Sequence, residues 1–205
     1  MHEQQPDTDL LLNLASAGDQ AATQKLFDRF RPRLRGMVAV HLDKRISARI
    51  DPSDVIQEAF AEAFEKLPDY VQQRTVSFYP WLRRIAWQRL VKLHETHLEA
   101  TRRSVKLENP GAMPLPDDSL MQLAGQLASS GTEPGQALVK QEMRERVRAA
   151  LEQLRHADRE VLVMRYLEHL TIKEISETLE INQETVKKRH TRALERLERF
   201  LEDTS

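Results

Sequence analysis

Basic side chains crowd a short stretch near the C-terminus, and their types suit binding to nucleic acid. The stretch is LTIKEISETLEINQETVKKRHTRALERL, residues 170–197, and its second half is basic. Lysine and arginine bind the phosphate oxygens of DNA, and arginine also reads base edges in the major groove. On a helix, Val186 and Leu197 would face inward and leave the basic residues on or near the outer surface. These residues are Lys187, Lys188, Arg189, His190 and Arg192.

Two helices and a tight turn must position these side chains. Thr171 is a good N-cap with Glu174 three residues later, so a capping box starts the first helix. Asn182 can cap the second helix. This is the layout of a DNA-binding helix-turn-helix, in which early residues of the second helix enter the major groove. Many such turns place glycine where Glu180 stands, and a left-handed glutamate costs about 1 kcal/mol. The alternative is an ordinary helical hairpin with a solvated charged face.

A second basic stretch contains aromatic residues. The segment SFYPWLRRIAWQRLVKLHETHL, residues 77–98, predicts a helix in which Trp81 and Trp87 lie among arginines and a lysine. Pro80 is tolerated there because it falls in the first turn. Bases of single-stranded nucleic acid stack on aromatic rings while phosphates meet the cations, at about 1–3 kcal/mol per stacked base. The alternative is that both tryptophans belong to the core.

An acidic helix precedes the aromatic one. Asp51, Pro52 and Asp54 form a strong helix start, with a cap, a proline in the first helical position and an acid in the first turn. One face is apolar and the other is acidic, so it is either a solvated face or a docking surface for a basic partner. We expect the apolar face to contain Val55, Ile56, Ala59, Phe60, Ala63, Phe64 and Leu67. The polar face contains Asp54, Gln57, Glu58, Glu62 and Glu65.

Composition predicts an all-α protein of two small helical domains joined by a flexible linker. The chain has 205 residues, no cysteine, a net charge of −1 and few glycines and prolines, several of which cluster between residues 109 and 135. We expect domains at residues 1–100 and 135–205, with the linker at 101–134. No apolar run is long enough to span a bilayer, and the first residues do not form a signal peptide. This favours a cytoplasmic protein without a membrane partner.

No residue pattern indicates an enzyme, a cofactor or a metal. Cysteine ligands are absent, and no glycine-rich phosphate loop stands out. His94 and His97 have two residues between them, whereas the helical zinc protease motif needs three.

Taken together, four segments resemble bacterial extracytoplasmic-function sigma factors of the sigma-70 superfamily. They are LLNLASAGDQAATQKLFDRFRPRL, DPSDVIQEAFAEAFEKL, FYPWLRRIAW and LEQLRHADREVLVMRYLEHLTIKEISETLEINQETVKKRHTRALERL, in the family's order. The resemblance implies a region 2 domain and a region 4 domain on either side of the linker. It also implies an RNA polymerase sigma factor that binds core polymerase, directs it to promoters and helps melt the −10 region.

The resemblance assigns three groups of residues to this function. The acidic helix would dock on the polymerase clamp through Asp54, Gln57 and Glu58. The aromatic helix would bind the −10 element and single-stranded DNA through Trp81, Arg84, Trp87, Gln88 and Lys92. The recognition helix would read the −35 element through Gln183, Glu184, Thr185, Lys187, Lys188, Arg189 and Arg192. By charge, we assign Lys187 and Arg192 mostly to phosphates, and Lys188 and Arg189 to bases or phosphates. The expected partners are therefore core RNA polymerase and promoter DNA, and the family also allows an anti-sigma factor.

Two other functions fit parts of the sequence. A helix-turn-helix regulator would bind duplex DNA without joining polymerase, but it would need a dimer interface, and no heptad or sensor domain is evident. A helical adaptor that binds a protein would leave the aromatic, basic helix and the acidic helix unexplained.

Overall fold

The computed structural model describes residues 5–42, 51–98, 115–129 and 137–202. Within these ranges the regular structure is helical and contains no strand, which confirms the all-α prediction. Contacts divide the chain into two compact units, residues 1–105 and 106–205. Among the described helices, none is both long and apolar enough to cross a membrane.

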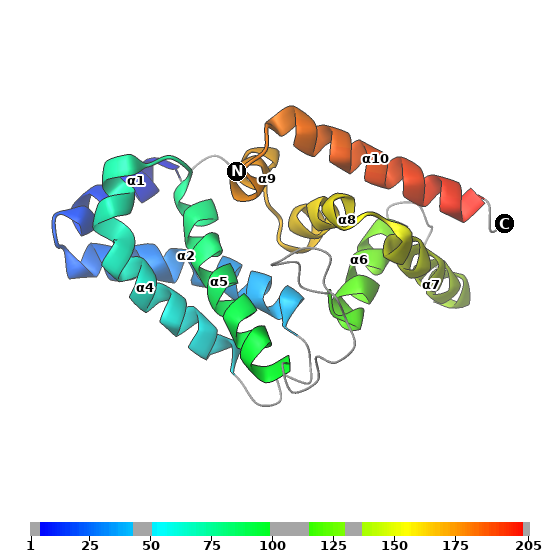
Figure 1. Ribbon diagram of the computed structural model, residues 1–205, viewed down its shortest axis with the longest axis horizontal. Helices are drawn as coiled ribbons and strands as arrows, with labels where there is room; N and C mark the ends of the chain where they lie inside the picture. Colours follow the sequence, from blue (N-terminus) through cyan, green and yellow to red (C-terminus); the bar gives the residue numbers. More distant parts are fainter. Residues whose placement is uncertain (1–4, 43–50, 99–114, 130–136, 203–205) are drawn as a thin grey trace. The chain divides into compact units, whose positions relative to one another are not determined.

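The first unit consists of α1 (Gln5–Ser16), α2 (Gln20–His41), α4 (Pro52–Gln73) and α5 (Phe78–Leu98) (Figure 1). The sequence signals for helix starts are confirmed. The Asp51 carboxylate accepts a hydrogen bond from the Ser53 backbone N–H at 2.8 Å, and Pro52 is the first helical residue. α2 continues through Pro32, which does not end it.

Large apolar side chains from α2, α4 and α5 fill the core of this unit. Leu34, Ile56 and Leu82 are fully buried, and the rings of Phe27 and Phe60 stack at 4.8 Å. Phe64, which we expected on the apolar face of α4, is 53% exposed instead. Each helical residue advances about 100° around the axis, so Phe64 lies about 40° beyond Phe60, at the edge of the buried face.

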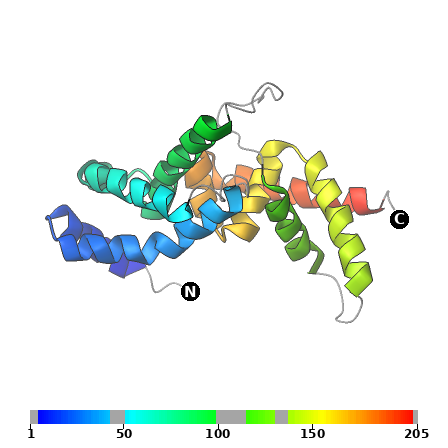
Figure 2. The same cartoon turned by 90° about the horizontal axis from the view of Figure 1, so that it is seen from below.

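The second unit contains a helix that the sequence analysis had placed in the linker. α6 (Asp117–Ser129) packs against α7 (Ala137–Gln153), and Figures 1 and 2 show the two side by side. Leu120, Leu123 and Ala124 are buried there. Their spacing allows one or two helical turns between segments rich in proline and glycine, and the helix that forms is longer than that. Residues 117–129 of the expected linker at 101–134 thus form a helix of the second unit, while residues 101–114 and 130–134 lie outside the described residues.

The remaining elements of the second unit support the basic helix. α8 (His156–Leu162) continues into a π-helical turn, η1 (Val163–Leu167), followed by α9 (Ile172–Leu179) and α10 (Gln183–Glu202). α10 packs on α7, α8 and α9. Val161, Leu162 and Met164 are buried, so α8 and η1 form part of the core on which α10 rests.

Candidate nucleic-acid interface

The turn between α9 and α10 has the geometry that the sequence predicted. Thr171 and Glu174 form the reciprocal capping box, and Thr185 donates its backbone N–H to the Asn182 side chain at 2.7 Å. Glu180 adopts the left-handed conformation, with φ 54° and ψ 38°. The Ser176 carbonyl oxygen accepts hydrogen bonds from the backbone N–H groups of Glu180 and Ile181, and the Ser176 hydroxyl donates to the Ile181 carbonyl at 2.6 Å. These bonds hold the turn although the position is not glycine.

The predicted DNA contacts of α10 differ in their surroundings. Val186, Ala193 and Leu197 are buried, which fixes the inner face of the helix. Lys187 pairs with Glu184 at 2.7 Å, and this hydrogen bond lowers the pKa of the Glu184 carboxyl. The other predicted contacts are Gln183, Lys188 and Arg192, which are exposed, and Thr185 and Arg189, which are half-buried.

Two contacts hold the middle of α10 to the rest of the unit, and neither follows from the residue pattern of α10. Arg192 and Arg196 both pair with Asp158 of α8, whose side chain is 2% exposed. The His190 ring stacks on Tyr166 of η1, with 3.2 Å between Nε2 and the phenol oxygen. Burial, and secondarily the charge of Arg165, lowers the pKa of His190. These contacts join residues at least 24 positions apart, so no local pattern could have predicted them.

The outer face of α5 brings together most of the residues predicted for single-stranded DNA. Arg84, Gln88 and Lys92 are exposed and recur every four residues, so they form one stripe along the helix. Trp81 begins this stripe. It is half-buried, and its ring stacks on Tyr70 at 4.5 Å.

Trp87 lies apart from that stripe, on the flank of α5. Its ring lies nearly perpendicular to that of His41, with 4.8 Å between the ring centroids, and the Arg83 guanidinium lies 5.5 Å from the indole centroid. Arg83 itself is only 4% exposed, which its sequence context among basic residues did not suggest. Both tryptophans are thus half-buried, so each packs against the fold and also keeps some exposed surface.

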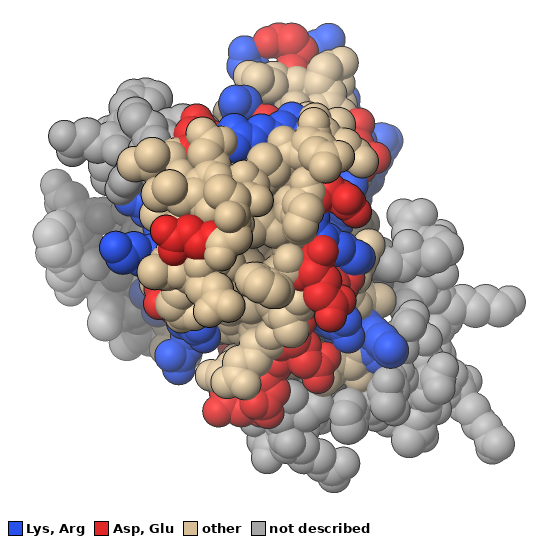
Figure 3. All heavy atoms as spheres, turned by 90° about the vertical axis from the view of Figure 1, so that its left-hand side faces the viewer, with Lys and Arg blue, Asp and Glu red and all other residues tan. Residues whose placement is uncertain are grey.

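The outer face of α4 carries Asp54, Gln57 and Glu58, all exposed as the docking prediction requires. Figure 3 looks onto one side of the first unit, where acidic and basic side chains lie in small separate groups around a mostly uncharged surface.

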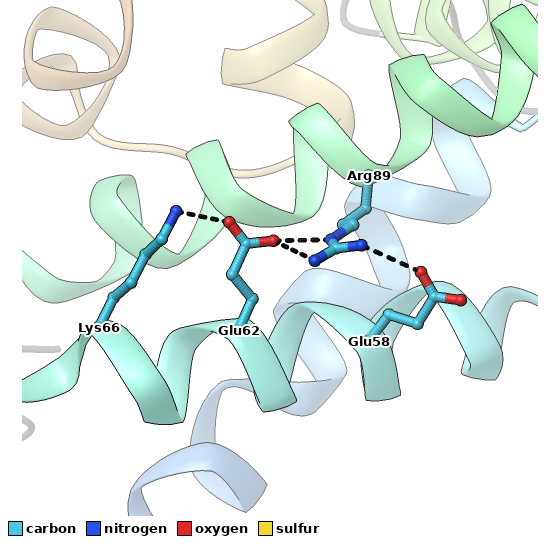
Figure 4. A network of polar contacts seen from close by, with 4 residues as sticks. All are labelled: Glu58, Glu62, Lys66 and Arg89. Atoms are coloured by element: carbon cyan, nitrogen blue, oxygen red, sulfur yellow. Dashed lines mark hydrogen bonds and ion pairs between the residues drawn. The ribbon is translucent and has the colours of Figure 1, made fainter.

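Glu62, which the sequence analysis placed on the acidic face, turns towards α5 instead (Figure 4). Its Oε2 accepts a hydrogen bond from Nε of Arg89 at 2.6 Å and forms an ion pair with Nη2 at 2.6 Å, and its Oε1 accepts a hydrogen bond from Lys66 at 2.6 Å. Arg89 also approaches Glu58, at 3.6 Å. The hydrogen bond from Lys66, followed by that from Arg89, lowers the pKa of the Glu62 carboxyl. Arg89 is therefore committed to α4 and is not part of the outer stripe of α5.

Comparison with known proteins decides the family. The family model for sigma-70 region 2 matches residues 26–97, and that for sigma-70 region 4 matches residues 144–197. The chain is also 26% identical to the "ECF RNA polymerase sigma-E factor" of Escherichia coli K12, over 97% of this chain and 95% of that protein, and equally similar to the one from Shigella flexneri. The chain belongs to the extracytoplasmic-function sigma factors.

The two matches lie in the two units of this sigma factor. Region 2 begins within α2 and ends within α5, and region 4 runs from α7 into α10, so α1 and α6 lie outside both matches. A solved structure titled "Structure of CnrH in complex with the cytosolic domain of CnrY" has the same fold, with a TM-score of 0.55 and 22% identity over 97% of this chain and 99% of that one. The family and fold class expected from the four sequence segments are confirmed.

Proposed function

We propose that this sigma factor binds core RNA polymerase, directs it to specific promoters and helps to open the −10 region. One observation carries the proposal: two separate helices expose cationic and hydrogen-bonding side chains, one in each region matched by a sigma-70 model. A duplex-binding regulator would need only α10. The stripe on α5, with a half-exposed tryptophan at its start, fits unpaired bases and their phosphates.

The residues divide into three roles. Asp54, Gln57 and Glu58 on α4 dock on a basic surface of the polymerase clamp. The non-template strand of the −10 element binds to the outer stripe of α5. This stripe consists of Trp81, Arg84, Gln88 and Lys92, and Trp87 flanks it. The early residues of α10 enter the major groove of the −35 element, where Gln183 reads base edges and Lys188 binds a phosphate. These assignments follow from exposure on the described helices together with the family resemblance.

Melting in this proposal draws its energy from base capture. Extruding a base from the duplex costs a few kcal/mol, and stacking that base on an aromatic ring returns about 1–3 kcal/mol. One or two stacking sites, together with phosphate contacts, therefore nearly offset the cost of extrusion. Trp81 has Tyr70 against its ring, which holds the indole in place before a base arrives.

Transcription with purified core RNA polymerase and a genomic promoter library tests the proposal. We expect discrete start sites that appear only when the protein is added. Gln57→Ala and Asp54→Asn should weaken binding to core polymerase, because both side chains lie on the exposed face of α4. Glu65→Gln is the matched control, since it removes an exposed acid from the same helix outside the proposed docking set. Glu58→Gln is a poorer test because Glu58 also contacts Arg89.

The result that would overturn the proposal is equally specific. If the protein neither yields transcripts nor co-elutes with core polymerase but still binds duplex DNA, it is a regulator that acts without joining polymerase. If Asp54→Asn and Glu65→Gln behave alike, the docking assignment fails while the promoter assignments stand.

We also propose a cytoplasmic location and a regulatory protein partner. Core polymerase and promoters are in the cytoplasm. CnrH, which has a similar fold, was solved in complex with the cytosolic domain of CnrY. Co-purification of this chain from cells, with and without crosslinking, would test whether it binds a regulatory protein partner.

A further inference from the structure

A buried carboxylate joins α8 to the recognition helix. Asp158 is 2% exposed, and its two oxygens face two arginines that are one helical turn apart on α10. Arg196 donates a hydrogen bond to Oδ2 at 3.3 Å, and Nη1 of Arg192 lies 3.8 Å from Oδ1. A buried carboxylate without a partner is strongly unfavourable, so this pairing fixes which part of α10 lies over the start of α8.

The side of the contact that α8 supplies is rigid. Asp158 lies in the first turn of α8, and Val161 and Leu162 of the same helix are completely buried. A second contact, between His190 and Tyr166, also holds α10, and His190 lies two residues before Arg192 in the helix. The candidate DNA contacts begin at Gln183, about 10 Å further along the axis at 1.5 Å per residue. Any rotation or shift of α10 at these contacts is therefore carried to the residues that enter the groove, where small errors in placement are costly.

We propose that Asp158 is a positioning residue for the recognition helix, and that Arg192 belongs to this Asp158–Arg192–Arg196 clamp and is not a phosphate ligand. The proposal rests on the proposed function, because it concerns how α10 meets the −35 element. It revises the sequence interpretation, in which charge alone assigned Arg192 to phosphates.

The dependence of DNA affinity on salt separates the two roles of Arg192. Each phosphate contact contributes about 0.9 to the slope of log affinity against log salt concentration, whereas a positioning residue changes affinity without changing that slope. We expect Arg192→Gln to lower affinity for the −35 element with an unchanged slope. Lys188→Gln should make the slope shallower by about 1. Arg199→Gln is the matched control, because Arg199 is an exposed arginine of α10 that does not contact Asp158.

A double-mutant cycle tests the clamp itself. We expect Asp158→Asn to lower affinity about tenfold, comparable with losing one base contact. In that background Arg192→Gln should have little further effect, since the partner is already gone. Because Asp158→Asn removes a buried charge, helicity is first checked by circular dichroism. Arg192→Gln keeps the Asp158–Arg196 hydrogen bond. Its salt slope therefore distinguishes a positioning role of Arg192 from a phosphate contact even if Asp158→Asn does not fold.

The binding experiment uses holoenzyme assembled from the full-length chain and a duplex fragment carrying the −35 element that the wild-type protein selects. A shallower slope for Arg192→Gln, an unchanged affinity for that variant, or fully additive effects in the cycle would each overturn the clamp. Failure of the wild-type holoenzyme to bind any −35 fragment would instead refute the proposed function, and the positioning role would fall with it.

Discussion

Replacing Glu62 by glutamine would remove the charge at the centre of the network between α4 and α5. The wild-type carboxylate accepts a hydrogen bond from Arg89 Nε on one oxygen, which also pairs with Nη2 of the same guanidinium, and a hydrogen bond from Lys66 on the other oxygen. In the variant, the amide must turn its NH₂ group towards one of these two cations, so a donor faces a donor. We expect the first unit to become less stable while its fold stays the same.

The size of the effect follows from the exposure of each partner. A hydrogen bond to a charged group contributes about 1.5–3 kcal/mol when it is shielded from water. The Lys66 side chain is 53% exposed, so its share is small. Arg89 is 33% exposed and can move towards Glu58, which recovers part of the loss. We therefore expect Glu62→Gln to lower the free energy of unfolding by about 1–2 kcal/mol.

Tryptophan fluorescence during urea unfolding measures this change in the intact chain. Both tryptophans of the protein, Trp81 and Trp87, lie on α5, so the signal follows the first unit alone. Glu65→Gln is the control, and as an exposed substitution it should change stability by less than about 0.5 kcal/mol. A double-mutant cycle that combines Glu62→Gln with Arg89→Gln isolates the coupling energy between the Glu62 and Arg89 side chains. A coupling energy near zero would show that the ion pair contributes nothing and would refute the reasoning.

The effect should also depend on pH. Because the pKa of Glu62 is lowered from its ordinary value of 4.5 in the folded state, its contribution is complete above pH 4.5 and is lost as the pH falls through the folded-state pKa. The difference in stability between wild type and Glu62→Gln should therefore shrink as the solution is acidified below pH 4.5. A difference that stays constant down to pH 2 would contradict this account.

Three further predictions concern the second unit and can be measured by hydrogen exchange of the α9 and α10 amides. Thr171→Ala removes the capping box and should lower local stability by about 0.5–2 kcal/mol, whereas no change would mean that the cap is replaced by water. Glu180→Gly relieves the left-handed strain and should raise stability by about 0.5–1 kcal/mol, and a decrease would show that the glutamate side chain contributes more than the strain costs. Burial lowers the pKa of His190 below 6.5, so the unfolded state takes up the proton first and stability should fall as the pH drops below 6.5. His190→Gln should reduce that dependence, and an unaltered pH profile would exclude His190 as its source.

Features encoded by neighbouring residues could be predicted from the sequence. The capping box at Thr171, the proline start at Pro52 and the helix-turn-helix layout each depend on residues within one or two turns. The unusual Glu180 was also recognised, because the need for a left-handed residue follows from the turn alone. These local signals were enough for the fold class and, with the resemblance, for the family.

Features that depend on tertiary packing could not be predicted in this way. α6 has a short helical stripe whose burial is decided by α7, and its flanking prolines and glycines favoured a linker. Phe64 has the residue type of a core position, but its place around α4 leaves it exposed. Glu62 looked like one more acid on a solvated face until α5 brought Arg89 to within 2.6 Å. In each case the deciding neighbour lies on another helix.

The same reasoning limits how many cations of α10 can act on phosphates. If Lys187, Lys188, Arg189 and Arg192 all bound phosphates, replacing the four by glutamine would make the salt slope shallower by about 3.6. Lys187 already pairs with Glu184 three residues away, and Arg192 pairs with Asp158 across 34 residues. Lys188 and Arg189 are then left to bind phosphates, so we expect the quadruple variant to make the salt slope shallower by only about 1.8. A change near 3.6 in the holoenzyme would mean that both ion pairs break on binding and that DNA competes successfully with a buried carboxylate for Arg192.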